Sequence, residues 1–213
     1  MVSKTQPETL RLIPQLHPET LHLAVNLFDR YCTYGVVHDY VLLGCVTLLI
    51  AAKYRDDIEN VQRLRQKCCA LRDGSVLTQT EWHVLQKLNW EVGHPTVVDF
   101  QQIDITTSIE ALHNPLLEHW LEQLSLYLAE ITLYHKEFTS IRPSIVSSCT
   151  LALAHDILRL ERPTGEAWVL SVSENLIHCL STHLARPPVV PFHRYVHCRS
   201  PYLRTAIELY LRQ

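Results

Sequence analysis

Apolar residues recur with helical spacing along this chain, and one segment is apolar on every side. The segment from Tyr40 to Asp57 carries no charge through Ala52 and meets its first charge at Lys53. A bilayer span needs roughly 20 apolar residues, so this segment is too short to cross a membrane. A helix without a polar face is expected to be enclosed by other helices. The pattern therefore predicts a buried central helix, in which the small residues Gly44, Ala51 and Ala52 let neighbours approach closely.

The first half of the chain contains further segments with helical spacing. They are Leu21 to Tyr34, Ile58 to Cys69 and Leu77 to Trp90. The first of them is amphipathic. Pro7 and Pro18 stand where a first helical residue is expected in two similar runs, QPETLRL and HPETLHL, and only the second run continues as a helical pattern. Thr78 followed by Glu81 has the form of a capping box, although the helix could also start earlier.

The second half of the chain repeats this layout. Gly93-His94-Pro95 is the clearest break, and it predicts two domains, 1–94 and 95–213. A long amphipathic segment, Leu116 to Tyr134, precedes a nearly uncharged one, Pro143 to Leu158, which predicts a second buried helix. Shorter helices are expected at Thr96 to Gln102, Trp168 to Ala185 and Ser200 to Leu211, with breaks at the prolines between the last two. Because no segment alternates like a strand, we expect an all-α fold of two tandem helical halves, each with a buried central helix.

Composition and charge narrow the classes of function. The chain has 213 residues, of which 47% are hydrophobic, so it can bury a sizeable core. Its formal charge of −3 provides no basic field, so we expect no nucleic-acid partner. Seven cysteines without paired spacing indicate free thiols in a reducing, intracellular compartment. The first residues lack the apolar run of a signal peptide, and we expect no membrane association.

Signs of catalytic chemistry are weak. Five dispersed glycines do not form a phosphate-binding loop, and no glycine-flanked serine resembles a nucleophile elbow. The best metal candidate is His193 with His197 and Cys198, but no carboxylate or second cysteine completes a site there. We therefore expect no metal, no cofactor, no small-molecule substrate and no enzymatic activity.

Two runs carry a family resemblance. HPETLHLAVNLFDRY at His17 to Tyr31 and GCVTLLIAAKYRDD at Gly44 to Asp57 together resemble a cyclin box. The first is similar to the family's second helix with its Asp-Arg pair, and the second is similar to the central helix. The resemblance continues to the closing helix and includes a second cyclin fold. The motif Leu-Asn-Trp followed by His-Pro-Thr is most similar to fungal G1 or G1/S cyclins.

The resemblance implies a non-catalytic subunit that binds and activates a cyclin-dependent protein kinase, in the nucleus and/or the cytoplasm. Cyclins press the surface beside their central helix against a kinase helix, which places the kinase's catalytic Lys–Glu pair and activation loop. The positions that match the family's polar contacts are Lys53 and Glu81. Those that match its apolar contact surface are Ile50, Tyr54, Leu85, Trp90 and Val92.

Plainer interpretations exist for several of these residues. Lys53 could be the solvated end of a buried helix, and Glu81 could be the capping partner of Thr78. Three of the apolar residues, Ile50, Leu85 and Trp90, could belong to the core. We interpret Asp29 and Arg30 as structural, with Asp29 a buried anion rather than a catalytic acid.

Two features depart from the family pattern. Arg55 stands where the family has an acid, and such a reversal beside an interface can change the choice of kinase. Upstream of His17 nothing resembles the family's first helix, which provides an arginine partner for the Asp29 position and a substrate-docking patch. A buried Asp29 without a partner would cost on the order of 3–5 kcal/mol. Arg11 is the candidate replacement partner, and the chain is then either a cyclin with a rebuilt N-terminus or a truncated one.

Two other functions compete with kinase activation. One is a cyclin-fold adaptor in transcription, which would bind nucleic acid or polymerase machinery. The other is a truncated cyclin that cannot activate a kinase.

Overall fold

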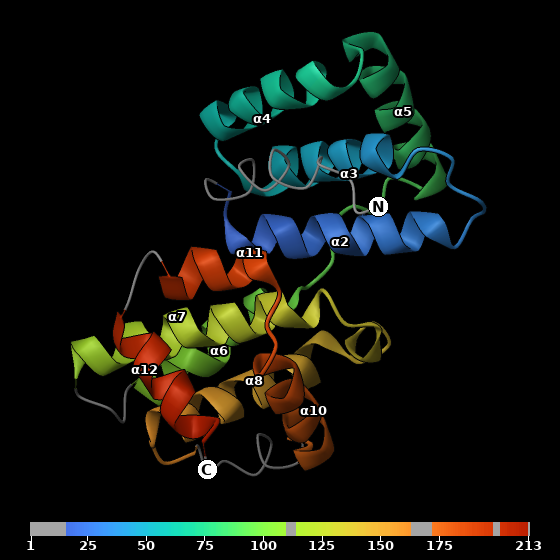
Figure 1. Cartoon of the computed structure of the whole chain (residues 1–213). Coiled ribbons are helices and arrows are strands. Elements are labelled where there is room, and N and C mark those ends of the chain that lie inside the picture. Colours follow the sequence, from blue (N-terminus) through green and yellow to red (C-terminus); the bar gives the residue numbers. More distant parts are fainter. Residues whose placement is uncertain (1–15, 110–113, 163–171, 198–200, 213) are drawn as a thin grey trace. The chain divides into compact units, whose positions relative to one another are not determined.

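The computed structural model describes residues 16–109, 114–162, 172–197 and 201–212 (Figure 1). These ranges contain helices and connecting segments and no strand, which confirms the predicted all-α class. The chain divides into two compact units, Met1–His94 and Pro95–Gln213, here called unit 1 and unit 2. No helix in the described ranges is long and apolar enough to cross a bilayer. The six cysteines within them are free thiols.

Unit 1 is built around the predicted central helix. Its helices are α2 (Pro18–Cys32), α3 (Tyr40–Arg55), α4 (Ile58–Leu71) and α5 (Gly74–Lys87). α3 contacts each of the other three, and every residue from Cys45 to Ala52 is buried. α3 has almost no polar side to turn toward water, so its neighbours cover it on several sides (Figure 1).

One expectation about α3, the close approach of a neighbouring helix at Gly44, is not met. Ala51 and Ala52 are fully buried, as their small size predicted. A Cβ atom at Gly44, however, would meet nothing within 4 Å. The close approach predicted at Gly44 is therefore wrong, because no residue in the described part of the chain packs against that side of the helix.

α5 begins earlier than the capping-box interpretation required. Asp73 is its N-cap and accepts a hydrogen bond from the Ser75 N–H at 2.8 Å. Thr78 lies inside the helix, where its hydroxyl donates to the Gly74 carbonyl oxygen at 3.0 Å. The predicted capping box of Thr78 and Glu81 is therefore wrong, because Asp73 already satisfies the first N–H groups.

Unit 2 repeats the arrangement around a second buried helix. Its elements are α6 (Val97–Ile109), α7 (Pro115–Thr132), η2 (Lys136–Phe138), α8 (Pro143–Leu158), α10 (Glu174–Leu184), α11 (Val189–Pro191), η3 (Phe192–His197) and α12 (Pro201–Tyr210). α8 has the bounds predicted from the sequence, is buried along most of its length, and contacts α6, α7, α10 and α12. The second central helix is thereby confirmed.

Tertiary contacts extend α6 beyond its predicted end at Gln102. The side chain of Gln101 is buried and donates hydrogen bonds to the Ser125 carbonyl oxygen at 2.9 Å and to the Thr150 hydroxyl at 2.7 Å. Ile105, one turn further on, is also buried. These contacts hold a stretch whose polar and β-branched residues are only moderate helix formers.

The segment after α10 departs from a simple break. The prolines predicted to interrupt the chain are followed by the short helix α11 and by η3, a π-helical turn. Arg194 on η3 pairs with Glu130 on α7 at 2.6 Å, and both side chains are almost fully enclosed. No local sequence pattern predicts this contact, which holds the segment against α7.

Some predictions fall outside the described residues. Arg11 and the first PETL run precede residue 16, and the start of the helix predicted from Trp168 lies within 163–171. The described part of that helix begins at Glu174. Cys198 also lies outside, as do the side chains of His193 and His197, so the structure does not describe that candidate metal cluster.

Candidate protein-binding surface of unit 1

The last turn of α3 and the middle of α5 bring Lys53 and Glu81 together. The Lys53 ammonium lies 2.5 Å from a carboxylate oxygen of Glu81. The side chain of Lys53 is 40% exposed and that of Glu81 is 15% exposed. The ion pair therefore stands at the surface, with Glu81 set deeper than Lys53. A lysine has three N–H groups and a carboxylate has two oxygens, so both keep capacity for a partner.

Tyr54 flanks this ion pair on α3 and is 57% exposed. The guanidinium carbon of Arg55 lies 5.9 Å from the centre of its ring. The Tyr54 hydroxyl lies so close to Gly93 that a Cβ atom at position 93 would be only 2.7 Å from the hydroxyl oxygen. The glycine at position 93 thus lets Tyr54 hold this position.

A left-handed turn after α5 directs Trp90 into solvent. The helix ends at Lys87, so the predicted helical placement of Trp90 is wrong. Asn89 and Trp90 have φ angles of 52° and 60°. Asn often adopts this conformation, but a bulky residue such as Trp seldom does. The Trp90 N–H donates to the Leu85 carbonyl oxygen at 2.9 Å, and the side chain is 53% exposed.

Arg30 holds this turn against α2. Its guanidinium donates to the Glu91 carbonyl oxygen at 2.8 Å and lies 3.9 Å from the Glu91 carboxylate. A hydrogen bond from a charged donor to a backbone carbonyl fixes the path of the chain more firmly than a neutral one. Arg30 therefore supports the segment that carries Trp90 and Val92.

Trp82 joins Trp90 at this surface, although the sequence analysis did not select it. The two rings meet edge to face, with centroids 5.1 Å apart, and Trp82 is 57% exposed. They form part of a shallow groove lined by Thr78, Gln79, Glu81, Trp82, Leu85 and Trp90. Helical spacing placed Trp82 in the segment from Leu77 to Trp90, but this spacing alone does not distinguish an exposed tryptophan from a buried one.

The remaining predicted contact residues lie deeper. Ile50 is 4% exposed and belongs to the core of unit 1, which agrees with its plainer interpretation. Leu85 and Val92 are half-buried and pack against the same core. Leu85 also lines the groove. The outer surface is therefore made by the Lys53–Glu81 pair with Tyr54, Trp82 and Trp90, and the aliphatic residues support it from below.

Asp29 does not fit the expected buried anion. Asp29 lies on α2 and is exposed, and no described residue forms an ion pair with it. Partial desolvation nevertheless raises the pKa of Asp29 above its ordinary value. The structural cost estimated for an unpaired buried carboxylate does not apply to an exposed group.

Asp56 performs a structural role that the sequence analysis missed. It caps the end of α3 and accepts hydrogen bonds from the Thr20 hydroxyl and, at 3.0 Å, from the Asn60 amide. The His17 N–H lies 3.4 Å from the same carboxylate. Asp56 therefore ties the start of α2 to the connection between α3 and α4. The adjacent acids Asp56 and Asp57 were visible in the sequence, but their partners were not.

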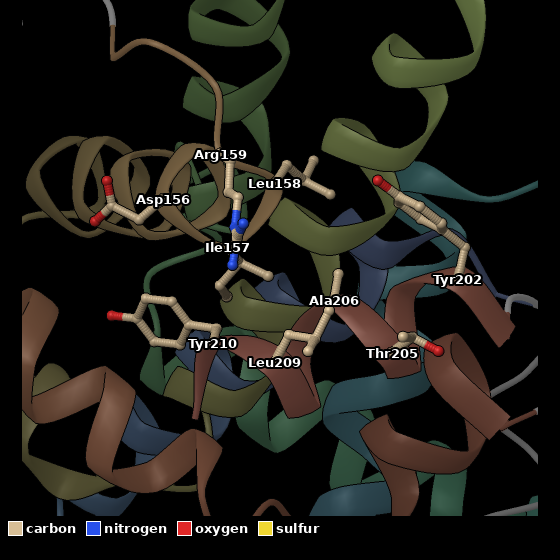
Figure 2. A pocket seen from close by; sticks show the side chains of 9 residues that line it. All are labelled: Asp156, Ile157, Leu158, Arg159, Tyr202, Thr205, Ala206, Leu209 and Tyr210. Atoms are coloured by element: carbon tan, nitrogen blue, oxygen red, sulfur yellow. The ribbon is translucent and has the colours of Figure 1, made fainter. Parts of the chain in front are cut away.

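A second depression lies in unit 2, where the end of α8 faces α12 (Figure 2). Its lining residues are Asp156, Ile157, Leu158, Arg159, Tyr202, Thr205, Ala206, Leu209 and Tyr210. The only carboxylate among them, Asp156, is already held by two hydrogen bonds from Arg162, at 2.8 and 2.5 Å. The depression therefore presents no free acid–base pair.

Comparison with known proteins gives two matches to family models. The model "Cyclin, N-terminal domain" matches residues 13–93, and "Cyclin, C-terminal domain" matches residues 95–186. The chain is 30% identical to the G1/S-specific cyclin CCN1 of Candida albicans over 165 residues, which is 68% of this chain and 24% of that protein. It is 36% identical to human cyclin-O over 149 residues, 68% of this chain and 43% of that protein. The matches thus span less than half the length of these relatives.

Proposed function

This chain belongs to the cyclin family, and we propose that it is a regulatory subunit that binds and activates a cyclin-dependent protein kinase in cell-cycle control, at G1 or the G1/S transition. The kinase holds ATP and magnesium, and this chain contributes neither a catalytic residue nor a cofactor. It acts in the nucleus and/or the cytoplasm, without nucleic acid, a membrane or a small-molecule substrate as partner.

The observation that carries this proposal is the exposed aromatic patch around the Lys53–Glu81 pair. Large aromatic side chains are usually covered, but Tyr54, Trp82 and Trp90 are each more than half exposed. Aromatic residues are enriched at the energetic centres of protein interfaces. An ion pair among them provides donors and an acceptor for the backbone of a bound helix. The aromatic side chains together with the ion pair are suited to a protein partner whose helix presents both apolar and polar groups.

Activation follows from preferential binding to one kinase conformation. In an active kinase a Lys–Glu ion pair and the activation loop must both be in place. A partner that binds this arrangement more tightly than the inactive one shifts the population toward it. We propose that Lys53, Glu81, Tyr54, Leu85, Trp90 and Val92 bind the kinase, that Trp82 joins them, and that Ile50 supports them from the core.

Arg55 bears on which kinase is bound. It lies beside Tyr54 at the edge of the patch, in a position where the family has an acid. A positive charge there repels a basic kinase surface and attracts an acidic one. We therefore propose that this chain prefers a kinase with acidic residues opposite Arg55.

Isothermal calorimetry of the purified chain with a cell-cycle cyclin-dependent kinase tests the proposal. We expect tight binding, and we expect Lys53→Ala and Trp90→Ala each to weaken it by about tenfold or more, as for hot-spot residues. Lys87→Ala is the matched control, because Lys87 is also an exposed lysine of unit 1 but takes no part in the Lys53–Glu81 ion pair. Thermal unfolding of each variant shows whether the fold is retained.

The outcomes separate the competing functions. Failure of a cooperatively folded chain to bind any such kinase would contradict the proposal and favour the transcription adaptor. Binding without stimulation of kinase activity toward a substrate would instead indicate a cyclin that cannot activate.

A further inference from the structure

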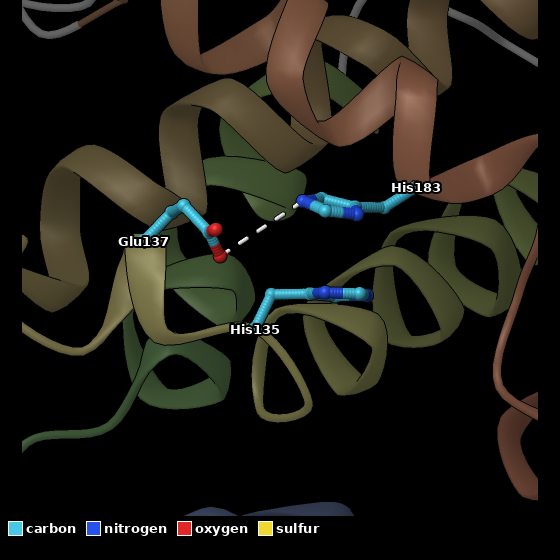
Figure 3. Close-up of side chains that lie close together, drawn as sticks. All are labelled: His135, Glu137 and His183. Carbon is cyan, nitrogen blue, oxygen red and sulfur yellow. Dashed lines mark ion pairs between the residues drawn. The ribbon is translucent and has the colours of Figure 1, made fainter.

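Three potential metal ligands meet in unit 2, away from the aromatic patch. His135 and Glu137 lie at the start and in the middle of the short connection after α7, and His183 lies in the last turn of α10 (Figure 3). One ligand atom from each lies within 4.8 Å of the others. The rings of His135 and His183 lie face to face with centroids 3.5 Å apart, and the Glu137 carboxylate points toward His183 at 4.0 Å.

Cys179 is a candidate fourth ligand next to this cluster, although its sulfur is not among the three ligand atoms that all lie within 4.8 Å of one another. Cys179 precedes His183 by one turn of α10, and its sulfur lies 3.6 Å from Nε2 of His183. Cys179 is a free, half-buried thiol. Imidazole, carboxylate and thiolate together are the ligand types of zinc, whereas calcium and magnesium prefer oxygen ligands alone.

One ring nitrogen of His135 is unsatisfied. Its Nε2 atom is buried and has no hydrogen-bond partner. A buried, unpartnered imidazole nitrogen costs free energy, and a metal ion is one group that would satisfy it.

From this arrangement we propose that His135, Glu137 and His183, with Cys179 as the fourth ligand, bind one divalent transition-metal ion of the zinc class. The proposal stands independently of kinase binding. From the sequence we expect no metal, and the best candidate there is a different group, His193 with His197 and Cys198. The ligands here come from two segments, His-x-Glu and Cys-x-x-x-His, that are far apart in the chain.

The two imidazole rings must rotate to hold an ion. Zinc–nitrogen distances are about 2.0–2.1 Å, so two ligating nitrogens lie roughly 3.4 Å apart around a tetrahedral ion. The ring centroids of His135 and His183 are 3.5 Å apart, which is compatible with this spacing between nitrogens. The rings are nearly parallel, however, with 19° between their planes. Their lone pairs converge only after the rings rotate about the Cβ–Cγ bond, a torsion with a broad energy minimum. Glu137 is 45% exposed, which leaves a path for the ion.

The bound ion would act as a structural link. It would join α10 to the connection between α7 and α8. All three helices pack around the core of unit 2. Four protein ligands close the coordination sphere, which is typical of structural rather than catalytic zinc. A ligand that binds only the folded state stabilises it, so metal should raise the melting temperature of the whole chain.

Titration of the metal-free chain of 213 residues with Co²⁺ and with Zn²⁺ tests this site. We expect one equivalent of Co²⁺ to produce the visible absorption of a tetrahedral ion and the ultraviolet band of a cobalt–thiolate bond, and Zn²⁺ to displace it. Cys179→Ser should remove the thiolate band. His183→Ala and Glu137→Gln should weaken binding by at least about tenfold, because even residues that only support a metal ligand change affinity about 10- to 100-fold.

Two controls keep the result interpretable. His178→Ala removes an exposed histidine from the same helix and should leave affinity unchanged. Glu137→Gln changes an exposed side chain, and thermal unfolding of this variant serves as the second control, because it shows whether the fold is retained. The proposal would be overturned by the absence of saturable binding, or by equal affinity in the parent chain, His183→Ala and Glu137→Gln. Loss of binding only when His193 and His197 are replaced would also overturn it and place the metal there.

Discussion

Asp39 makes two kinds of contact at the start of α3. Its carboxylate accepts the Leu42 N–H at 2.9 Å as the N-cap, and it also accepts two hydrogen bonds from the Arg72 guanidinium at 2.8 and 3.1 Å. Arg72 is the C-cap of α4, so one side chain joins the ends of two helices. The hydrogen bonds from Arg72, followed by that from Leu42, lower the pKa of Asp39 to about 2.

We expect Asp39→Ala to lower the free energy of unfolding by about 1 kcal/mol, the usual value of an N-cap. Asp39→Asn should cost less, because Asn also caps helices but cannot pair with Arg72 in the same way. Thermal unfolding of both variants at neutral pH measures the two contributions. A larger loss for Asn than for Ala would contradict this assignment.

The charge of Asp39 should also appear in the pH dependence of stability. The pKa in the folded state, about 2, is below the unfolded value of about 3.9. The stabilisation is therefore fully present above about pH 4 and is lost as the pH falls toward 2. We expect the difference in melting temperature between the parent chain and Asp39→Asn to shrink over this interval. A constant difference would exclude the linkage.

At the scale of elements, α3 and α8 organise the two units in the same manner. Each is a helix of 16 residues, nearly uncharged and buried on several sides. Their small residues are not equivalent, however. Ala51 is completely buried, whereas the missing Cβ of Gly44 would enter open space.

This contrast predicts opposite effects of adding side-chain volume to α3. Gly44→Ala should stabilise the chain by roughly 0.5–1 kcal/mol, because glycine in a helix interior is unfavourable relative to alanine. Ala51→Leu should destabilise it by about 1–3 kcal/mol through overpacking. Chemical denaturation of the two variants measures both values. Destabilisation by Gly44→Ala would mean that a neighbour does pack against that position.

At the scale of the whole molecule, the apolar residues form two separate cores. One contains buried residues of unit 1, including Leu27, and the other contains buried residues of unit 2, including Leu124. Both of these leucines are fully enclosed. Each unit therefore has the internal contacts of a domain.

We expect a cavity in one core to weaken mainly the unit that contains it. Leu27→Ala and Leu124→Ala should each cost about 2–5 kcal/mol of local stability. Hydrogen exchange should show reduced protection concentrated in unit 1 for the first variant and in unit 2 for the second. Equal loss of protection in both units would show that they unfold as one.

The candidate binding surface was only partly predictable. Lys53 and Glu81 could be selected because they stand at family positions, and the structure places them in one ion pair. The exposure of Trp90 depends on the left-handed turn after α5, for which a tryptophan gives no local signal. Trp82 and Ile50 both lie at apolar helical positions, and only packing makes one exposed and the other buried.

The sequence by itself determined the helical class, the two central helices and the family, because periodicity and short motifs are local properties of the chain. Tertiary structure alone decided that Asp29 is exposed, that Asp56 joins α2 to the end of α3, and that His135 meets His183. These features depend on which distant segment packs against each helix face. The hydrophobic pattern shows that a face must be covered, but it does not specify the residue that covers it.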